Sequence, residues 1–547
     1  MITERTGVVK SAEMAEPLGE VTVSCTDEDG VVVGRADSDS DGRWTIHELP
    51  RSGTLHFEHE GYITKSYPTH AVPEMVRLLE RRLIGYHDWL WCRPGEEVTA
   101  YIHAPEPFSA TLYRHGLDNT AVMTFPENDP RIQQVPDGIF VETGLDWEPA
   151  LTYAIPDTAE PGLYSLLLTS GNQPDFAIPL VVSTPPDADV SDRNDLLVLA
   201  STNNWLSYNI WGGRNRYRNF EEGLSEPYLW DPSFFSELLA RAGSIAPAPL
   251  VRSIRKLAGM PPTDPDWKFK KLSIKRPFTN CALEDSDATN PFTNHLAAGE
   301  WRVLAWLERE EIPYDITSCY ELHRHPEMLE HYKAVLLSTH SEYWSEEMYY
   351  ALKENHLENG LSIANVSGNS IYREVAFYAD GSHRCASLKF GESVEDETRL
   401  IGVRFTEGDF GTCAPYNVLE PDHWIFEGLH VRDGQQIGLR SLNRRLPRET
   451  DRYDPGKPGV KSGLRGEGAS GWETDKLSST APADFVTVAK GQNRWGGADM
   501  VVREPGGTRG GVFSASSITF GGSLLIEEIC SGLMNNVLNR FLSSPPQ

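Results

Sequence analysis

The stretch Ala334-Val335-Leu336-Leu337-Ser338-Thr339-His340-Ser341-Glu342-Tyr343-Trp344-Ser345 decides the fold of the second half of this chain. An apolar run over residues 334–337 stops at a polar and aromatic segment, and residues 346–359 then carry a helical pattern that ends at Gly360. This order predicts a strand, a loop and a helix. Because ligands of open α/β sheets bind beyond the carboxyl ends of the strands, we expect His340 and Glu342 to face one site.

The same alternation extends on both sides of that stretch. Apolar strands are predicted over residues 196–200, 314–317 and 361–366, and a helix over residues 296–311. Strands that alternate with helices favour a mostly parallel sheet. We therefore predict an α/β domain over residues 191–547, with an insertion at about residues 221–270 that carries its own helix.

The first third of the chain has a different texture. Residues 1–82 contain short alternating strands separated by turn signals, which is typical of a small β-sandwich. Residues 83–190 are predicted to form a second β-sandwich-like domain, and residues 185–189 read as a linker. The predicted fold class is thus multidomain, with β-sandwich modules followed by an α/β core.

Composition excludes several functions. The 547 residues include 50 Lys plus Arg and 79 Asp plus Glu, a formal net charge of −29. Such a surface repels phosphates, so we expect neither nucleic-acid nor anionic-membrane binding. The seven cysteines form no CxxC pair and the N-terminus lacks an apolar signal-peptide core, which together predict a cytoplasmic protein.

Several segments resemble the large (catalytic) subunit of N,N-dimethylformamidase, over roughly residues 84–543. They are Ser201-Thr202-Asn203-Asn204-Trp205-Leu206-Ser207-Tyr208-Asn209, Gly212-Gly213-Arg214-Asn215-Arg216-Tyr217, Lys275-Arg276-Pro277-Phe278, His340-Ser341-Glu342-Tyr343-Trp344-Ser345, Gly368-Asn369-Ser370-Ile371-Tyr372, Trp424-Ile425-Phe426-Glu427-Gly428, Gly471-Trp472-Glu473-Thr474-Asp475 and Gly511-Val512-Phe513-Ser514. The turn Asp39-Ser40-Asp41-Gly42-Arg43-Trp44 resembles that of carboxypeptidase-regulatory-like, transthyretin-like modules. The first resemblance implies a glutamine-amidotransferase-like (flavodoxin-like) core and an amidohydrolase with one iron, bound by two tyrosines and a glutamate.

By position, Tyr208, Tyr217 and Glu342 are the ligands that this resemblance implies, with Tyr228 or Tyr343 as alternatives to Tyr217. Two phenolates and one carboxylate supply three negative charges, which neutralise a ferric ion. Oxygen ligands also suit a hard cation. The implied cofactor is therefore mononuclear iron, most simply Fe³⁺.

The remaining site residues follow from the same segments. Glu473 is the expected general base, His340 orients water or substrate or supports Glu342, and Asn369 offers an amide donor to a developing oxyanion. Asn209, Trp344 and Phe513 are assigned to substrate binding, Phe513 as an apolar wall against small alkyl groups.

The predicted function is cleavage of the C–N bond of a small amide or formamide-like substrate by metal-activated water. The alternative is a non-catalytic carbohydrate- or protein-binding protein with a decayed amidotransferase-like core. Retention of Tyr208, Glu342, Asn369 and Glu473 favours the enzyme.

We expect a homo-oligomer, because β modules offer edges and faces for self-association. The family enzyme also pairs with a small subunit, and the sequence does not decide whether this chain needs one.

Overall fold

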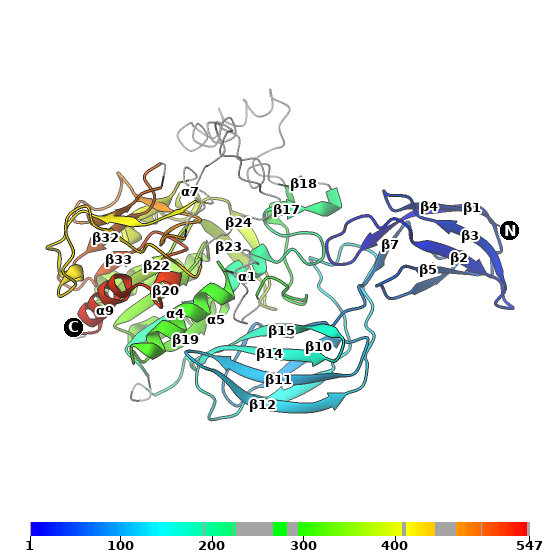
Figure 1. Cartoon of the computed structure of the whole chain (residues 1–547), viewed down its shortest axis with the longest axis horizontal. Helices are drawn as coiled ribbons and strands as arrows, with labels where there is room; N and C mark the ends of the chain where they lie inside the picture. The colour runs from blue at the N-terminus through cyan, green and yellow to red at the C-terminus, as the bar shows by residue number, and fades with distance from the viewer. Residues whose placement is uncertain are drawn as a thin grey trace, which may run out of the picture.

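The computed structural model describes residues 2–189, 191, 193–222, 224–225, 266–281, 294–406, 412–443, 467–493 and 495–543. Most of the predicted insertion, its helix and Tyr228 lie outside these residues. Two β-rich parts precede an α/β part that holds the carboxyl-terminal half of the chain (Figure 1).

The N-terminal β module contains two sheets that enclose one core. Val23, Trp44 and Phe57 are among the residues of this core and are almost fully buried. The strand orders are β4-β1-β7 and β3-β2-β5-β6. The strands are β1 Ile2–Ser11, β2 Thr22–Thr26, β3 Val32–Asp37, β4 Arg43–Leu49, β5 Thr54–Glu58, β6 Lys65–Pro68 and β7 Met75–Leu78.

The second β module also has two sheets, ordered β13-β10-β8 and β12-β11-β14-β15-β9. Leu112, Tyr164 and Leu180 lie in the core between them. The strands are β8 Ile84–His87, β9 Trp91–Cys92, β10 Glu97–His103, β11 Phe108–His115, β12 Asn119–Asn128, β13 Leu151–Ala154, β14 Gly162–Ser170 and β15 Gln173–Val182. Both modules are consistent with the predicted β-sandwiches.

The third part is built on a nine-stranded sheet of order β19-β16-β20-β22-β33-β32-β31-β27-β28. The strands are β16 Leu196–Ala200, β19 Asp315–Ser318, β20 Ala334–Thr339, β22 Ser362–Ser367, β27 Tyr416–Val418, β28 Gln436–Ile437, β31 Val486–Gly491, β32 Asp499–Arg503 and β33 Val512–Ser514. In the sheet order, the strands from β19 to β33 are parallel to one another, and the pairings from β33 through β28 are antiparallel. The expectation of a mostly parallel sheet is wrong for this second half, where β31, β32 and β33 follow one another through connections too short for a crossover helix.

Helices cover both faces of the parallel half. Alternate residues of β16 point in opposite directions: Leu196 and Val198 belong to one core and Leu197 and Leu199 to the other. Helices α4 (Ala297–Arg309) and α9 (Glu528–Leu542) pack on the first face, and α5 (Cys319–Arg324) and α6 (Glu346–Glu358) on the second. Only the strand ends are left for polar chemistry.

Helix α6 shows how the local sequence sets the boundaries next to that chemistry. The Ser345 side chain accepts a hydrogen bond from the backbone N–H of Met348, and two glutamates occupy the first turn. Such a cap satisfies an otherwise free donor and fixes where the helix begins. The preceding residues are therefore held as a short loop after β20.

Smaller elements complete this part of the chain. They are α1 Thr202–Tyr208, β17 Arg218–Asn219, β18 Leu224–Ser225, β21 Tyr343–Trp344, β23 Arg373–Phe377, β24 His383–Ser387, α7 Phe390–Ser393, α8 Thr398–Ile401, β25 Val403–Phe405, β26 Cys413–Ala414, β29 Ser470–Gly471 and β30 Asp475–Leu477. Short 3₁₀ turns lie at Phe220–Glu222, Asp266–Phe269, Pro326–His331, Trp424–Phe426 and Gly521–Ser523.

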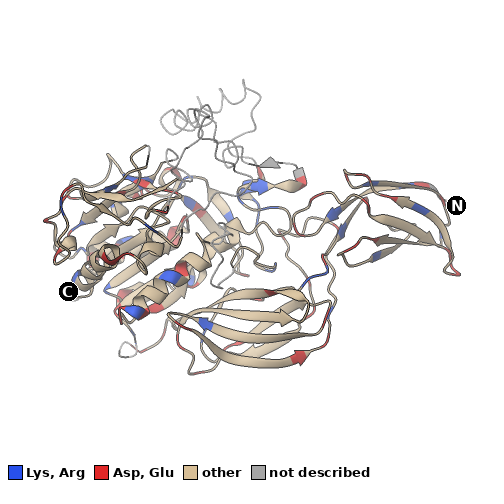
Figure 2. Ribbon diagram, viewed as in Figure 1, with Lys and Arg blue, Asp and Glu red and all other residues tan. Residues whose placement is uncertain are grey.

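Among the described residues, no helix has the length and apolar character needed to cross a membrane. Acidic and basic positions are spread over all three parts (Figure 2).

Candidate metal and active site

The candidate site lies where the parallel strands end. Tyr208 is the last residue of α1, which follows β16, and Glu342 lies in the loop between β20 and β21. Asn369 follows β22 by two residues. Glu473 comes from the loop between β29 and β30, in the antiparallel half of the domain. Residues far apart in the sequence thus meet at one edge of the sheet, as ligand sites of open α/β sheets do.

Two tyrosine hydroxyls converge on one buried carboxylate. The Tyr217 hydroxyl lies 2.9 Å from Oε1 and 2.7 Å from Oε2 of Glu342, and the Tyr208 hydroxyl lies 3.1 Å from Oε2. The two tyrosine rings pack with their centroids 4.6 Å apart. Glu342 is fully buried. This arrangement gathers two phenol oxygens and a carboxylate in one small volume.

Two of the three candidates for the third ligand, Tyr217 and Tyr343, lie within the described residues. Tyr343 donates its hydroxyl hydrogen to the Tyr217 hydroxyl oxygen at 2.9 Å and so sits one step behind it. Tyr228 lies outside the described residues. Among the residues that the structure describes, Tyr217 is therefore the candidate that contacts Glu342 together with Tyr208.

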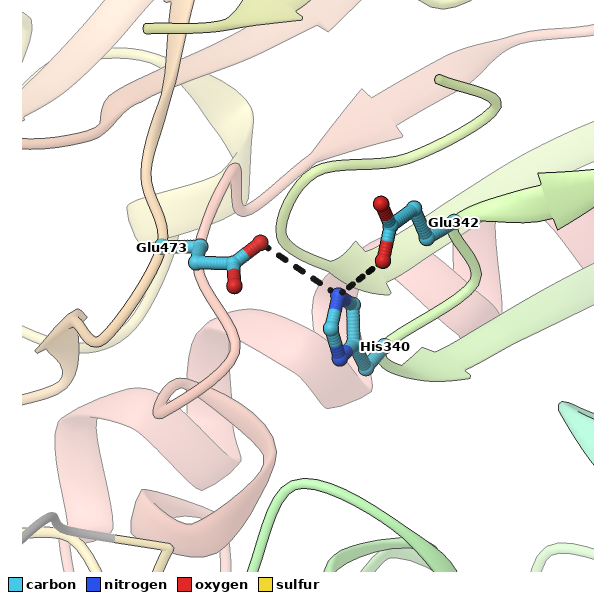
Figure 3. A group of neighbouring side chains, drawn as sticks. All are labelled: His340, Glu342 and Glu473. Carbon is cyan, nitrogen blue, oxygen red and sulfur yellow. Dashed lines mark ion pairs between the residues drawn. The ribbon is translucent and has the colours of Figure 1, made fainter. Parts of the chain in front are cut away.

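His340 joins this group to the predicted base. Its Nε2 lies 3.4 Å from Oε2 of Glu342 and 3.4 Å from Oε2 of Glu473, so one imidazole nitrogen faces both carboxylates (Figure 3). The donor atoms of His340, Glu342 and Glu473 lie within 4.8 Å of one another. Asn369 Nδ2 donates to Glu473 Oε2 at 2.7 Å, which fixes the orientation of that carboxylate.

Arg373, the first residue of β23, is a site residue that the sequence analysis missed. Its Nε donates to Glu342 Oε1 at 2.6 Å, and its guanidinium lies 5.3 Å from the centroid of the Tyr217 ring. The arginine side chain is 12% exposed. Only its place shortly after a parallel strand could have pointed to it, because no motif marks it. Arg373 occupies Oε1 of Glu342, whereas Oε2 faces Tyr208 and His340.

Burial and charge set the protonation of these groups. Burial, with the charge of Glu342 added, raises the pKa of the Tyr208 and Tyr217 hydroxyls well above the ordinary value. Burial alone would raise the pKa of Glu342, but Arg373 and His340 outweigh it and hold that pKa at about 2. Burial likewise opposes charge on His340, yet the two carboxylates raise its pKa to about 9. Without a metal the phenols keep their protons, so binding of a metal to them would release protons.

The backbone is strained at the residues that carry the site. Thr339, Asn369 and Trp472 have φ angles of +54°, +53° and +65°, in the left-handed region that costs non-glycine residues free energy. Thr339 directly precedes His340, and Trp472 directly precedes Glu473. Asn369 carries the side-chain amide that donates to Glu473. Buried contacts hold this strain: Asp475 Oδ1, for example, accepts the backbone N–H of Asn369 at 2.8 Å.

The three residues assigned to substrate binding all have structural partners. The Asn209 side chain donates to Pro277 O at 3.0 Å and accepts from Trp211 N at 3.1 Å. Trp344 Nε1 donates to Ser341 O at 3.0 Å. Phe513 is fully buried in the sheet core, where its ring centroid lies 6.0 Å from that of Phe520. Hydrogen bonds to the backbone account for the polar groups of Asn209 and Trp344, and packing in the core accounts for Phe513.

Aromatic side chains line another side of the site. The His295 ring lies 4.7 Å from Tyr208, 5.5 Å from His340 and 4.5 Å from Trp472, measured between centroids. Neither His295 nor Trp472 was singled out from the sequence. Both are buried, and His295 packs between Trp472 and Tyr208.

The profile of one family, described as N,N-dimethylformamidase beta subunit-like, C-terminal, matches residues 109–532. The chain belongs to this family. The resemblance predicted from the sequence motifs is thereby confirmed, and the matched range includes every residue of the candidate site.

Other comparisons add little to the family match. A search of curated proteins gave no match. Among solved structures, E. coli alpha-2-macroglobulin is 12% identical, with a TM-score of 0.14. The matched region covers 34% of this chain and 12% of that protein. BcpA, the major pilin subunit of Bacillus cereus, is 11% identical with a TM-score of 0.13 and covers 37% of this chain and 73% of its own. Such low scores carry no argument about function.

Proposed function

We propose that this chain is an iron-dependent amidohydrolase that cleaves the C–N bond of a small amide or formamide-like substrate. Membership in the dimethylformamidase-like family indicates the amidohydrolase class. The observation that carries the proposal is the convergence of the Tyr208 and Tyr217 hydroxyls on the Glu342 carboxylate, within 3.1 Å. The fold supports it as well, because the parallel strands, numbered along the domain, follow the order 2-1-3-4-5 of flavodoxin-like sheets.

The donor set fits a ferric ion. Tyr208, Tyr217 and Glu342 present only oxygen, and as two phenolates and a carboxylate they would balance three positive charges. Arg373 binds Oε1 of Glu342, whereas both tyrosine hydroxyls contact Oε2, which makes Oε2 the better-placed ligand atom. When bound, the ion supplies a Lewis acid beside the substrate carbonyl.

Glu473 is placed to take a proton from an attacking water. Its Oε2 lies 3.4 Å from the same His340 nitrogen that faces Glu342, and the two carboxylate oxygens lie within 4.8 Å of each other. Asn369 holds one carboxylate oxygen at 2.7 Å and so aims the other. A base that is fixed in this way contributes to the rate by proximity and orientation as well as by proton transfer.

His340 and Asn369 have distinct tasks in this scheme. The imidazole Nε2 contacts both carboxylates at 3.4 Å, so a protonated His340 links Glu473 to Glu342 and holds the two groups in a fixed relation. The side-chain amide of Asn369 has two hydrogens. One is given to Glu473, and we assign the other to the carbonyl oxygen of the substrate, where negative charge develops.

Metal analysis combined with visible absorption tests the proposal. We expect the purified chain to hold one iron and to show the charge-transfer band of ferric phenolate. Tyr208→Phe and Glu342→Ala should each lose most of the iron while the far-ultraviolet circular dichroism stays unchanged. Full iron occupancy in either variant would remove that residue from the site.

A further inference from the structure

The N-terminal β module contacts the segment of the α/β domain that carries Tyr217. This segment, residues 212–221, follows α1 and contains β17 and most of the turn at Phe220–Glu222. In Figure 1 it lies beside β7 of the module. The contacts are made at both ends of the segment, and Tyr217 lies between them.

The first end is held by the turn after β1. The backbone N–H of Gly212 donates to Glu13 O at 2.6 Å. Gly212 and Gly213 have φ angles of +95° and +86°, and a Cβ atom on Gly213 would lie 2.4 Å from the Cβ of Ala15. Only glycine permits both the backbone conformation and this close approach.

The second end is held by charge. Glu221 accepts a hydrogen bond from Lys10 Nζ at 3.3 Å, and it is also paired with the Arg77 guanidinium. The side chains of Lys10, Arg77 and Glu221 are 16%, 0% and 8% exposed, so the pairs are poorly screened by water. Lys10 lies on β1 and Arg77 on β7, the two parallel neighbours in one sheet of the module.

Between these ends the backbone is tied to both tyrosines. The N–H of Tyr217 donates to Asn215 Oδ1 at 2.8 Å, and Asn215 Nδ2 donates to the carbonyl oxygen of Tyr208 at 3.0 Å. A displacement of either end is therefore transmitted to the Tyr217 hydroxyl and to its distance from Glu342.

We infer that the N-terminal β module positions Tyr217 for the metal. The Glu13 carbonyl and the Lys10–Glu221–Arg77 cluster form a clamp on residues 212–221, and the module is part of the metal site's supporting structure. This inference rests on the proposed function. Glu221, Lys10 and Arg77 act as positioning residues, since none of them contacts Glu342.

The test uses the full-length chain with Glu221→Gln, which removes the charge and nearly keeps the shape. Hydrogen–deuterium exchange of the iron-free protein should become faster in residues 212–221 and stay unchanged in the β20 and β22 strands. Affinity for ferric iron, measured by competition with a chelator, should fall about 10-fold, as for loss of outer partners of metal ligands. The phenolate band should also shift, because the Tyr217 oxygen is displaced.

Two further variants complete the design. Lys10→Met removes one of the two pairs and should give a smaller change in the same direction, and Lys10→Arg should restore wild-type affinity. Glu4→Gln is the matched control, because Glu4 pairs with His47 on the same module at 3.2 Å but is exposed. It should change neither exchange nor affinity.

Three outcomes would decide against the clamp. Unchanged exchange over residues 212–221 in Glu221→Gln would overturn it, and so would exchange that rises equally throughout the chain. Faster exchange there with unchanged iron affinity and an unchanged band would also overturn it. If the wild-type chain bound no iron, the proposed function would fail, whereas exchange of the iron-free protein would still decide whether the module holds this segment.

Discussion

Replacing Glu473 by glutamine should abolish most turnover while leaving iron bound. The glutamine carbonyl oxygen can still accept the hydrogen bond that Asn369 Nδ2 now donates at 2.7 Å. The neutral amide loses the ion pair with His340 Nε2 at 3.4 Å, and it cannot accept a proton from water. The geometry of the site is therefore kept and one chemical task is removed.

The size of the effect follows from that task. General base catalysis contributes roughly 10²- to 10⁴-fold to a rate, so kcat should fall at least about 100-fold. That corresponds to about 2.7 kcal/mol in activation free energy. KM should change little, because Glu473 is assigned no part in holding the substrate in its ground state.

The assay compares wild type and variant on small amides, with release of the amine as the signal and iron content measured in the same samples. Asp475→Asn is the matched comparison: Asp475 is fully buried two residues away, but its carboxylate accepts the backbone N–H of Asn369. We expect a smaller loss for it. A Glu473→Gln enzyme with full iron and near-normal kcat would refute the reasoning and leave Asp475 or His340 as the base.

Three further predictions concern stability and assembly. Arg373→Met leaves the buried Glu342 carboxylate without its closest cation. Chemical denaturation of the iron-free protein should therefore show a loss of about 3–5 kcal/mol in unfolding free energy, part of which bound iron should restore. No loss would show that the ion pair is dispensable. Burial raises the pKa of Glu300 from 4.5 to about 7, so between these pH values the folded state holds a proton on Glu300 that the unfolded state has lost. The free energy of unfolding should therefore fall as pH rises from about 4.5 to 7. Thermal midpoints of the iron-free protein should show a flatter profile in Glu300→Gln, and an unchanged profile would contradict the assignment. Light scattering should give a homo-oligomer, and a monomer at working concentration would count against self-association of the β modules.

The sequence was most informative where local pattern and chain order determine structure. The predicted strand over residues 334–337 corresponds to β20, and the helix predicted to end near Gly360 corresponds to α6. Tyr208 and Glu342 could be placed at one edge because both follow parallel strands, and the carboxyl ends of such strands meet. These inferences need only hydrophobic periodicity and the rules of α/β topology.

Contacts that depend on distant segments could not be read in this way. Glu473 enters the site from the loop between β29 and β30, more than a hundred residues after Glu342, and only the family resemblance pointed to it. Arg373 has no motif at all. Phe513 shows another limit of the sequence pattern, since an apolar residue in a strand has the same pattern whether it lines a pocket or packs in the core, where its ring lies.

The central claim is that Tyr208, Tyr217 and Glu342 hold one ferric ion. Its most direct test is resonance Raman spectroscopy with excitation in the visible absorption band of the purified, iron-loaded chain, together with metal quantification. The account predicts one iron per chain and enhanced tyrosinate vibrations that weaken in both Tyr208→Phe and Tyr217→Phe. A chain that binds iron without tyrosinate vibrations, or one that binds no iron, would contradict it.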